Sequence, residues 1–428
     1  MAAGSRILIT GSGAICAAGK SPAEIWETLH SGRSAIGPIE LWDTAGWPRR
    51  VAGEVRGLEP AKLLGDRKIL KFIRRSDVFG LYAAGRAIEA SGIAAWRDGL
   101  DESVAAAYSD RTGVYVGSGG GTYDGQYDYF PLMTSAGGDL AEFGRQLPDV
   151  VNPMWLLRAL PNNVLCHVGI KYNLKGTNAC ITNHSTSGML AVQEAAAGLR
   201  EGEADRAVVA AHDAPIEPQT LVYYDAIGVV AEDTLRPFDA ARDGSLLGEG
   251  AAGFVLETEV SARARGATVL GEFLGGGSAT EGEGLLPIRE DGAGPAAAMQ
   301  AALEEGGLRA ADVGMIVAHG NGTRNSDASE AAAIRAVFGD DPPPVTGFKW
   351  AFGHLIAASG MLDTVLALEA LRARSVPGIA TLREIDPAIG WLPVSARPQA
   401  PRSDIALVVS RGFGGTNAAL VLRAAPAA

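Results

Sequence analysis

Short runs of β-branched and other apolar residues alternate with alanine-rich segments along the whole chain of 428 residues. The runs have the length of buried strands, and segments such as 187–200 and 362–374 carry apolar residues at helical spacing. Because strands and helices alternate, the sequence predicts an α/β architecture in which helices cover sheets. The predicted buried strands are 114–116, 207–210, 253–256, 315–317 and 405–409.

A weak internal repeat divides the chain. Residues 87–93 and 114–122 have the pattern of a helix end, a glycine turn, a strand and a glycine-rich loop, and residues 302–308 and 315–323 repeat that order. The repeat indicates two similar halves. We place the boundary at the charged segment that follows the strand at 253–256. The predicted halves are 1–257 and 258–428.

The composition excludes several classes of function. The formal net charge of −12 disfavours binding to nucleic acid. Cys16, Cys166 and Cys180 form no CxxC or similar pair, so neither a disulfide framework nor a metal site is expected. No apolar run is long enough for a membrane span. We therefore expect a cytoplasmic protein that holds no metal and does not enter a membrane.

The first apolar residues, 6–11, are too few and too broken by glycine for a signal peptide. We interpret them as a first strand that enters a tight turn at 11–13. A dinucleotide fingerprint would need a further glycine where Cys16 stands. A nucleotide site is therefore not expected.

Six basic residues lie between positions 62 and 75, opposed only by Asp66 and Asp77. Taken alone, such a charge run is explained by a solvated helix face. On a chain of negative net charge, it is also the kind of local patch that an acidic protein partner would need. The six are Lys62, Arg67, Lys68, Lys71, Arg74 and Arg75.

Ser185 stands just before the predicted helix at 187–200. A helix N-terminus offers free N–H groups and the positive end of the helix dipole, which activate a cysteine thiol but not a serine hydroxyl. A nucleophilic serine therefore needs a base within hydrogen-bond reach. The alternative interpretation is that Ser185 only caps the helix. Cys180, five residues upstream in a presumed strand, is interpreted as a buried structural thiol.

Two histidines bear on the role of this serine. His319 and His354 each stand beside a glycine-containing turn, and Lys349 precedes His354 by five residues. Neutral imidazoles with free N–H groups can stabilise negative charge on an oxygen.

Four segments, the first three of which contain these residues, resemble in this order the β-ketoacyl-acyl carrier protein synthases, the condensing enzymes of fatty acid and polyketide synthesis. The resemblance implies a thiolase-like, five-layered α/β fold made of two similar halves. It also implies a homodimer or a heterodimer with another ketosynthase. The expected partner is an acyl carrier protein, whose phosphopantetheine arm carries the substrate, so that no separate cofactor is needed. The segments are 183–188, 318–323, 349–354 and 412–417.

The resemblance assigns roles to individual residues. His319 and His354 would hold the thioester carbonyl of malonyl-carrier protein and promote its decarboxylation. Lys349 would orient the two histidines, with Glu330 as the ionic partner of the lysine. Phe413 matches a gating residue, and its N–H group would form the oxyanion hole together with that of the nucleophile.

Further implied roles concern the partner and the substrate arm. Arg67, Lys68 and Lys71 would hold the carrier protein. Thr323 would bind the pantetheine arm.

The chain departs from the family's pattern at five positions. Ser185 stands where cysteine is normal, and His184 where a small residue is usual. Asn321 replaces the first of two threonines that bind pantetheine. Arg411 occupies the position of a second aromatic residue in the gate. Gly120 stands where some fatty-acid enzymes have a bulky residue that closes the acyl tunnel, which predicts a longer or wider pocket.

Three functions fit these residues. The first is an acyltransferase in which His319 or His354 is the base for Ser185, with decarboxylative condensation of malonyl-carrier protein as the next step. The second is a malonyl-carrier protein decarboxylase or priming factor. The third is a non-condensing partner subunit like the chain-length factors, which commonly lose the histidines. Because His319, His354 and Lys349 are all present, we rank the functions in that order.

Overall fold

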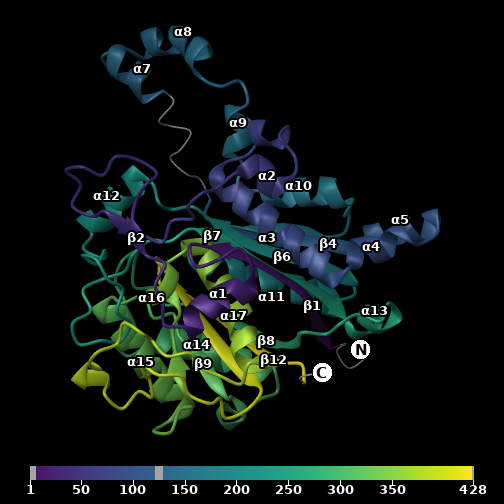
Figure 1. Ribbon diagram of the computed structural model, residues 1–428, viewed down its shortest axis with the longest axis vertical. Helices are drawn as coiled ribbons and strands as arrows, with labels where there is room; N and C mark the ends of the chain where they lie inside the picture. Colours follow the sequence, from purple (N-terminus) through teal and green to yellow (C-terminus); the bar gives the residue numbers. More distant parts are fainter. Residues whose placement is uncertain (1–5, 121–128, 427–428) are drawn as a thin grey trace.

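The computed structural model describes residues 6–120 and 129–426 (Figure 1). Ten strands within these residues form one mixed sheet in the order β5-β4-β6-β7-β1-β8-β12-β11-β9-β10. β1 (Ile7–Cys16) and β8 (Gly271–Thr280) pair over residues 7–9 and join the two halves. The other strands are β4 (Thr112–Ser118), β5 (Asn178–Ile181), β6 (Arg206–Asp213), β7 (Gly250–Thr258), β9 (Met315–Val317), β10 (Val345–Thr346), β11 (Ile405–Gly412) and β12 (Thr416–Ala424).

The two halves share one topology. Counted along the chain within each half, the strands lie in the order third, second, fourth, fifth, first, both in β5-β4-β6-β7-β1 and in β10-β9-β11-β12-β8. In each half the first three strands of that order are parallel, and the last two pair antiparallel with their neighbours. The predicted likeness of the halves is therefore confirmed. Residues 121 and 122 of the repeat lie outside the described residues.

Helices cover the two half-sheets in three layers (Figure 1). α3 (Arg75–Ser91) packs on β1, β6 and β7, and α14 (Ala293–Glu305) packs on β8 and β12. Between the half-sheets lie α11 (Ser187–Arg200) on β4 and β6 and α17 (Ser359–Arg372) on β7 and β11, in contact with each other. This order of layers is the expected five-layered α/β fold.

Most of the predicted elements are confirmed. All five predicted strands are present and buried, and α11 has the predicted bounds. α17 begins at Ser359, three residues before the predicted start. The remaining helices are α1 (Pro22–His30), α2 (Pro60–Leu64), α4 (Ile93–Asp98), α5 (Glu102–Asp110), α7 (Phe130–Ser135), α8 (Leu140–Val150), α9 (Trp155–Ala159), α10 (Asn163–Tyr172), α12 (Pro218–Ala226), α13 (Glu259–Ala264), α15 (Arg324–Phe338) and α16 (Lys349–Phe352), with 3₁₀ turns at 69–71, 310–312, 356–358 and 387–389 and a small sheet of β2 (Gly37–Pro38) and β3 (Val51–Ala52).

The predicted tight turn at 11–13 is wrong, because β1 continues through these residues. The two glycines allow close packing instead. A Cβ atom on Gly11 would lie 2.3 Å from the carbonyl oxygen of Ala87, and one on Gly13 would lie 2.2 Å from that of Ala83. α3 therefore lies closer to β1 than any side chain at these positions would allow.

An arm formed by α7, α8 and α9 projects from the body at the top of Figure 1. It exposes large apolar side chains, among them Leu140 and Leu156. Among the described residues, no helix is both long and apolar enough to cross a membrane.

Candidate active site

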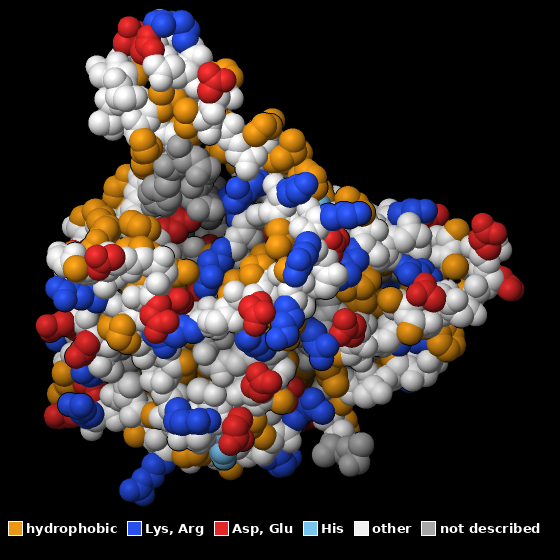
Figure 2. Space-filling view, turned by 45° about the horizontal axis from the view of Figure 1, so that its top comes forward, with side chains coloured by type: hydrophobic (Ala, Val, Ile, Leu, Met, Phe, Trp, Pro, Cys, Tyr) orange, Lys and Arg blue, Asp and Glu red, His pale blue; other side chains and the backbone are white. Residues whose placement is uncertain are grey.

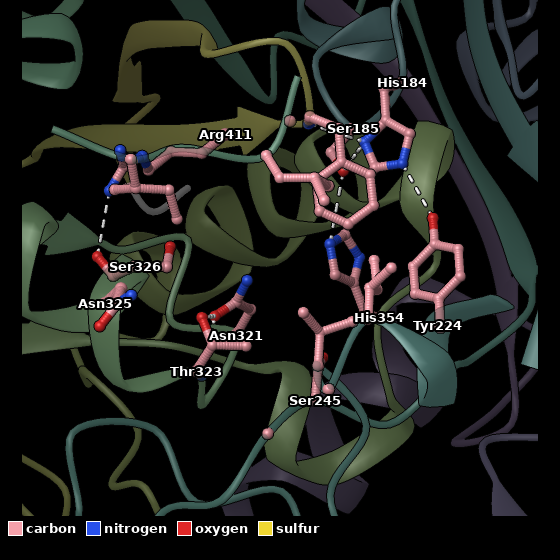
Figure 3. A pocket seen from close by; sticks show the side chains of 18 of the residues that line it. His184, Ser185, Tyr224, Ser245, Asn321, Thr323, Asn325, Ser326, His354 and Arg411 are labelled. Atoms are coloured by element: carbon pink, nitrogen blue, oxygen red, sulfur yellow. Dashed lines mark hydrogen bonds between the residues drawn. The ribbon is translucent and has the colours of Figure 1, made fainter. Parts of the chain in front are cut away.

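A cavity of about 390 Å³ opens beside the start of α11 (Figure 3). Ser185 lies in its wall, with a fully buried side chain. Figure 3 shows Ser185 between His184 and His354, with Asn321 and Thr323 on another part of the wall. The predicted nucleophile, one predicted histidine and the predicted pantetheine-binding residues therefore line the same cavity.

The backbone places Ser185 just outside the helix. α11 begins at Ser187 and its N-cap is Thr186, so Ser185 is not the capping residue. Ser187 Oγ accepts the Asn183 N–H (2.7 Å) and donates to the His184 carbonyl (2.7 Å). These bonds hold His184 at a φ of +47°, a left-handed conformation that few residues other than glycine adopt.

His354 carries its hydrogen on Nε2. Its Nδ1 accepts the Ile356 N–H (3.1 Å), and the Ser359 hydroxyl pairs with the same atom (2.8 Å). Burial, and then the charge of Lys349, keeps the pKa of His354 well below 6.5, so the ring is neutral. A neutral ring that accepts at Nδ1 donates from Nε2. This Nε2 lies 3.4 Å from Ser185 Oγ, so His354 donates to the serine and, contrary to expectation, is not placed to take its proton.

His319 is held in the same tautomer. Its Nδ1 accepts the Arg411 N–H (3.3 Å), which leaves the hydrogen on Nε2. Burial, then Lys349 and His354, keeps the pKa of His319 well below 6.5. The two rings lie edge to face with their centroids 5.0 Å apart. No hydrogen bond between His319 and Ser185 occurs in the described part of the chain, so His319 is not placed as the base either.

The predicted ionic partner of Lys349 is wrong. Lys349 Nζ donates to Asp363 Oδ2 (2.7 Å), and both side chains are fully buried. The Glu330 carboxylate instead accepts the N–H groups of His319 (2.6 Å) and Gly320 (3.0 Å), so it fixes the backbone after β9. The sequence signal that could have identified Asp363 was an acidic residue flanked by apolar residues near the start of helix α17, whose other acidic residue, Glu369, lies in the last turn.

His184 lies closer to the serine than either predicted histidine. Its Nδ1 is 3.0 Å from Ser185 Oγ, and its Nε2 is 2.9 Å from Tyr224 Oη. The Phe413 ring stacks on the imidazole at a centroid distance of 4.8 Å. Burial lowers the pKa of His184 to about 4, so the ring is neutral at neutral pH. In the sequence His184 stood out only as a departure from a pattern, and nothing distinguished Tyr224 from the neighbouring Tyr223.

The Phe413 N–H donates to His184 Nδ1 (3.3 Å). This group was predicted to be a free oxyanion donor. In the structure this N–H is already hydrogen-bonded to the His184 imidazole, because His184 is far larger than the small residue expected at that position.

Asn321 and Thr323 bind each other on the cavity wall. Both the N–H (3.0 Å) and the hydroxyl (2.9 Å) of Thr323 donate to Asn321 Oδ1. The amide nitrogen of Asn321 remains as a donor on a surface where the first of the two threonines was expected.

Each nitrogen of the Arg411 guanidinium makes a hydrogen bond within the protein. Its guanidinium donates to Glu281 Oε1 (2.7 Å), Asn417 Oδ1 (3.0 Å) and the Ser326 carbonyl (3.0 Å). Arg411 therefore shapes the cavity, which it lines, and its backbone orients His319.

Two further predicted positions lie outside the lining of this cavity. Gly120 has a φ of +84° and is not among the lining residues, so its effect on the width of an acyl tunnel stays a prediction. Cys180 is half-buried rather than buried, because β5 is an outer strand. Its Sγ donates to the Pro161 carbonyl (3.4 Å), and burial raises its pKa to about 11, as suits an unreactive thiol.

Two of the six basic residues, Arg74 and Arg75, pair with buried carboxylates of the fold. Arg74 is buried beside Asp77 (3.8 Å), and Arg75 is paired with the buried Glu249. The exposed members near the turn between α2 and α3 are Lys62, Arg67, Lys68 and Lys71. Figure 2 shows basic side chains gathered on the face below the projecting arm.

The described residues contain no group of three or more His, Cys, Asp or Glu side chains that could hold a metal ion.

Comparisons with known proteins place this chain in a family. The Beta-ketoacyl synthase, N-terminal domain matches residues 4–262, and the Beta-ketoacyl synthase, C-terminal domain matches residues 270–383. The chain is 32% identical over 429 residues to 3-oxoacyl-[acyl-carrier-protein] synthase 2 of Coxiella burnetii, across 97% of this chain and 98% of that one. It is 33% identical over 438 residues to the actinorhodin polyketide putative beta-ketoacyl synthase 1 of Streptomyces coelicolor, across 99% and 89%. The ishigamide ketosynthase/chain length factor has the same fold, with a TM-score of 0.87 at 28% identity over 99% of this chain and 100% of that one. The chain belongs to the β-ketoacyl synthase family.

Proposed function

We propose that the protein is an acyltransferase of fatty acid or polyketide synthesis that takes an acyl group from an acyl carrier protein onto Ser185. The observation that supports this is the position of Ser185 Oγ, buried in the cavity wall and hydrogen-bonded to both His184 and His354. An acyl chain on this atom has apolar side chains to lie against, such as Val230, Leu247 and Ile356. The wall therefore suits an acyl group bound at this serine.

Decarboxylative condensation is the second part of the proposal. The neutral rings of His319 and His354 each keep a hydrogen on Nε2. Two such donors can stabilise the enolate that forms when a malonyl thioester loses carbon dioxide. An oxyester on Ser185 is a weaker electrophile than a thioester, so we expect the condensing step to be slow.

We place this reaction in the cytoplasm, with the phosphopantetheine arm of the carrier protein as the only prosthetic group. No separate cofactor enters the proposed steps.

The proposal is tested by incubating the protein with acyl-carrier protein, with malonyl-carrier protein and with both. We expect loss of the acyl group from the carrier in the first arm, release of carbon dioxide in the second and a β-ketoacyl product in the third. Carbon dioxide release without acyl transfer would instead show a decarboxylase or priming factor. No reaction, either alone or with a partner ketosynthase, would show a non-condensing subunit like a chain-length factor.

The carrier protein is proposed to dock on Arg67, Lys68 and Lys71. Reversal of these three exposed charges should raise the KM for carrier-bound substrate about tenfold or more at low salt, since each exposed pair contributes about 0.2–1 kcal/mol. The remaining binding should also depend less on salt. Reversal of the exposed Arg263, Arg309 and Arg397 is the control. An unchanged KM at low salt would show that the segment is only a solvated surface.

The protein is further proposed to pair with a second ketosynthase subunit, identical or different, along β5. This strand is the outer strand of its half and pairs with β4 on one side. The exposed apolar side chains of the arm offer additional surface to a partner. Sedimentation should show a dimer at micromolar concentration, alone or with the partner subunit, and a lasting monomer would contradict the pairing.

A further inference from the structure

We propose that His184 is the base that takes the proton of Ser185 during acylation, and that Tyr224 positions it. This inference rests on the proposed acyl transfer to Ser185. It follows from the direction of the hydrogen bonds around Ser185 Oγ, which the surrounding backbone N–H groups determine.

The direction is set first at His354. The Ile356 N–H donates to its Nδ1, so the ring hydrogen is on Nε2 and points to Ser185 Oγ. A hydroxyl that accepts this bond directs its own hydrogen elsewhere. The other hydrogen-bond partner described for Ser185 Oγ is His184 Nδ1, at the shorter distance of 3.0 Å.

The direction at His184 is determined independently. The Phe413 N–H donates to Nδ1, so this atom carries a lone pair rather than a hydrogen, and the Ser185 hydroxyl shares that lone pair at the shorter distance. The ring is neutral and carries its hydrogen on Nε2, which donates to Tyr224 Oη at 2.9 Å. The bonds thus run one way, from His354 through Ser185 to His184 and Tyr224 (Figure 3).

This arrangement supports a balanced acylation step. Ser185 Oγ attacks the thioester carbonyl carbon while its proton passes to His184 Nδ1. The C–S bond then breaks, and the pantetheine sulfur takes that proton, which leaves an acyl oxyester and a free thiol. Nothing is oxidised or reduced.

The same lone pair couples proton transfer to oxyanion binding. Once protonated, Nδ1 no longer accepts the Phe413 N–H. That N–H becomes available to the carbonyl oxygen, which gains negative charge in the same step. His184 therefore blocks the predicted oxyanion donor only while Ser185 holds its proton.

Tyr224 would offset the cost of charging a buried ring. The burial that keeps His184 neutral also makes it a weak base, since its pKa is about 4. By accepting the Nε2–H, Tyr224 Oη stabilises the imidazolium as it forms. Among the described residues, the other titratable groups around the ring are His319 and His354, which lie toward the serine, and Asp213, Glu217 and Tyr223, which line a smaller cavity together with His184.

His184→Asn separates the base from its structural role. Asparagine tolerates the left-handed φ and can still accept a hydrogen bond near the Nδ1 position, but it takes up no proton. We expect single-turnover acylation by acyl-carrier protein to slow about 10²-fold, the lower part of the range for general base catalysis.

The matched experiment repeats this substitution in the Ser185→Cys background. A thiol ionises near the helix N-terminus without a base, so there His184→Asn should change acylation by no more than about threefold. Rapid acylation of this double variant also shows that the fold and carrier docking are intact. Tyr224→Phe should slow acylation about tenfold with Ser185, because a hydrogen bond to a charged ring is lost, and have little effect with Ser185→Cys.

The pH profile gives an independent measurement. With a base whose pKa is about 4, acylation of the wild type should be flat from about pH 5.5 to 8. A tenfold rise per pH unit below about 6.5 would assign the base to a histidine of ordinary pKa and overturn the role of His184.

The remaining outcomes distinguish the two proposals. If wild type and His184→Asn acylate equally fast on Ser185, the role of His184 is overturned while acyl transfer stands. If wild-type Ser185 is never acylated, the proposed function fails, and the assignment of His184 fails with it.

Discussion

Ser185→Ala should abolish acyl transfer from the carrier protein, with a loss on the order of 10⁴-fold or more, as expected when a covalent nucleophile is removed. The effect is large because Ser185 Oγ is held between His184 Nδ1 and His354 Nε2 at the cavity wall. No other hydroxyl among the described residues is held by both of these rings. The rate of acyl loss from the carrier protein measures the effect.

Ser245→Ala is the matched control for this substitution. It removes a hydroxyl from the same cavity wall, one that makes no hydrogen bond within the described residues, and should leave transfer within about twofold of wild type. Ser185→Cys should act in the opposite direction and speed acylation, because a thiolate is available there and the thioester makes condensation easier. Residual transfer by Ser185→Ala at the wild-type rate would mean that the acyl group goes elsewhere.

The second large effect concerns decarboxylation. His319→Ala and His354→Ala should each slow the release of carbon dioxide from malonyl-carrier protein, on the order of 10²-fold for one lost oxyanion donor. Ser185→Ala should retain this activity, since the two Nε2–H donors do not depend on the serine. Carbon dioxide released from labelled malonyl-carrier protein is the measurement.

The exposed His30 on α1 provides the control, and His30→Ala should release carbon dioxide at the wild-type rate. If His319→Ala and His354→Ala were as active as wild type, the histidine pair would have no part in the chemistry. If decarboxylation were also absent in the wild type, the chain-length-factor alternative would be favoured.

The fold was largely predictable because it depends on short-range patterns. Buried strands such as 315–317 are apolar runs, and α11 begins at the residue where helical spacing begins. The error at Gly11 and Gly13 has a tertiary cause. Glycine is as suitable for the close approach of a helix as for a turn, and only the position of α3 distinguishes the two.

The site was only partly predictable, because its hydrogen bonds join residues that are distant in sequence. Asp363 reaches Lys349 from α17, whereas the candidate that the resemblance implied, Glu330, is satisfied by two backbone N–H groups. Tyr224 meets His184 only because α12 folds back onto the start of α11. The choice of base needed the tautomers of the rings, which depend on backbone donors that no motif displays.

Intact-protein mass spectrometry after incubation with acyl-carrier protein shows whether Ser185 carries an acyl group. We expect one added acyl mass on the wild type, mapped to Ser185, removed by alkali and resistant to hydroxylamine at neutral pH as an oxyester is. Ser185→Ala should show no such mass. A wild type that stays unmodified while Ser185→Cys is acylated at once would exclude acyl transfer to Ser185 and identify the serine as a disabled nucleophile.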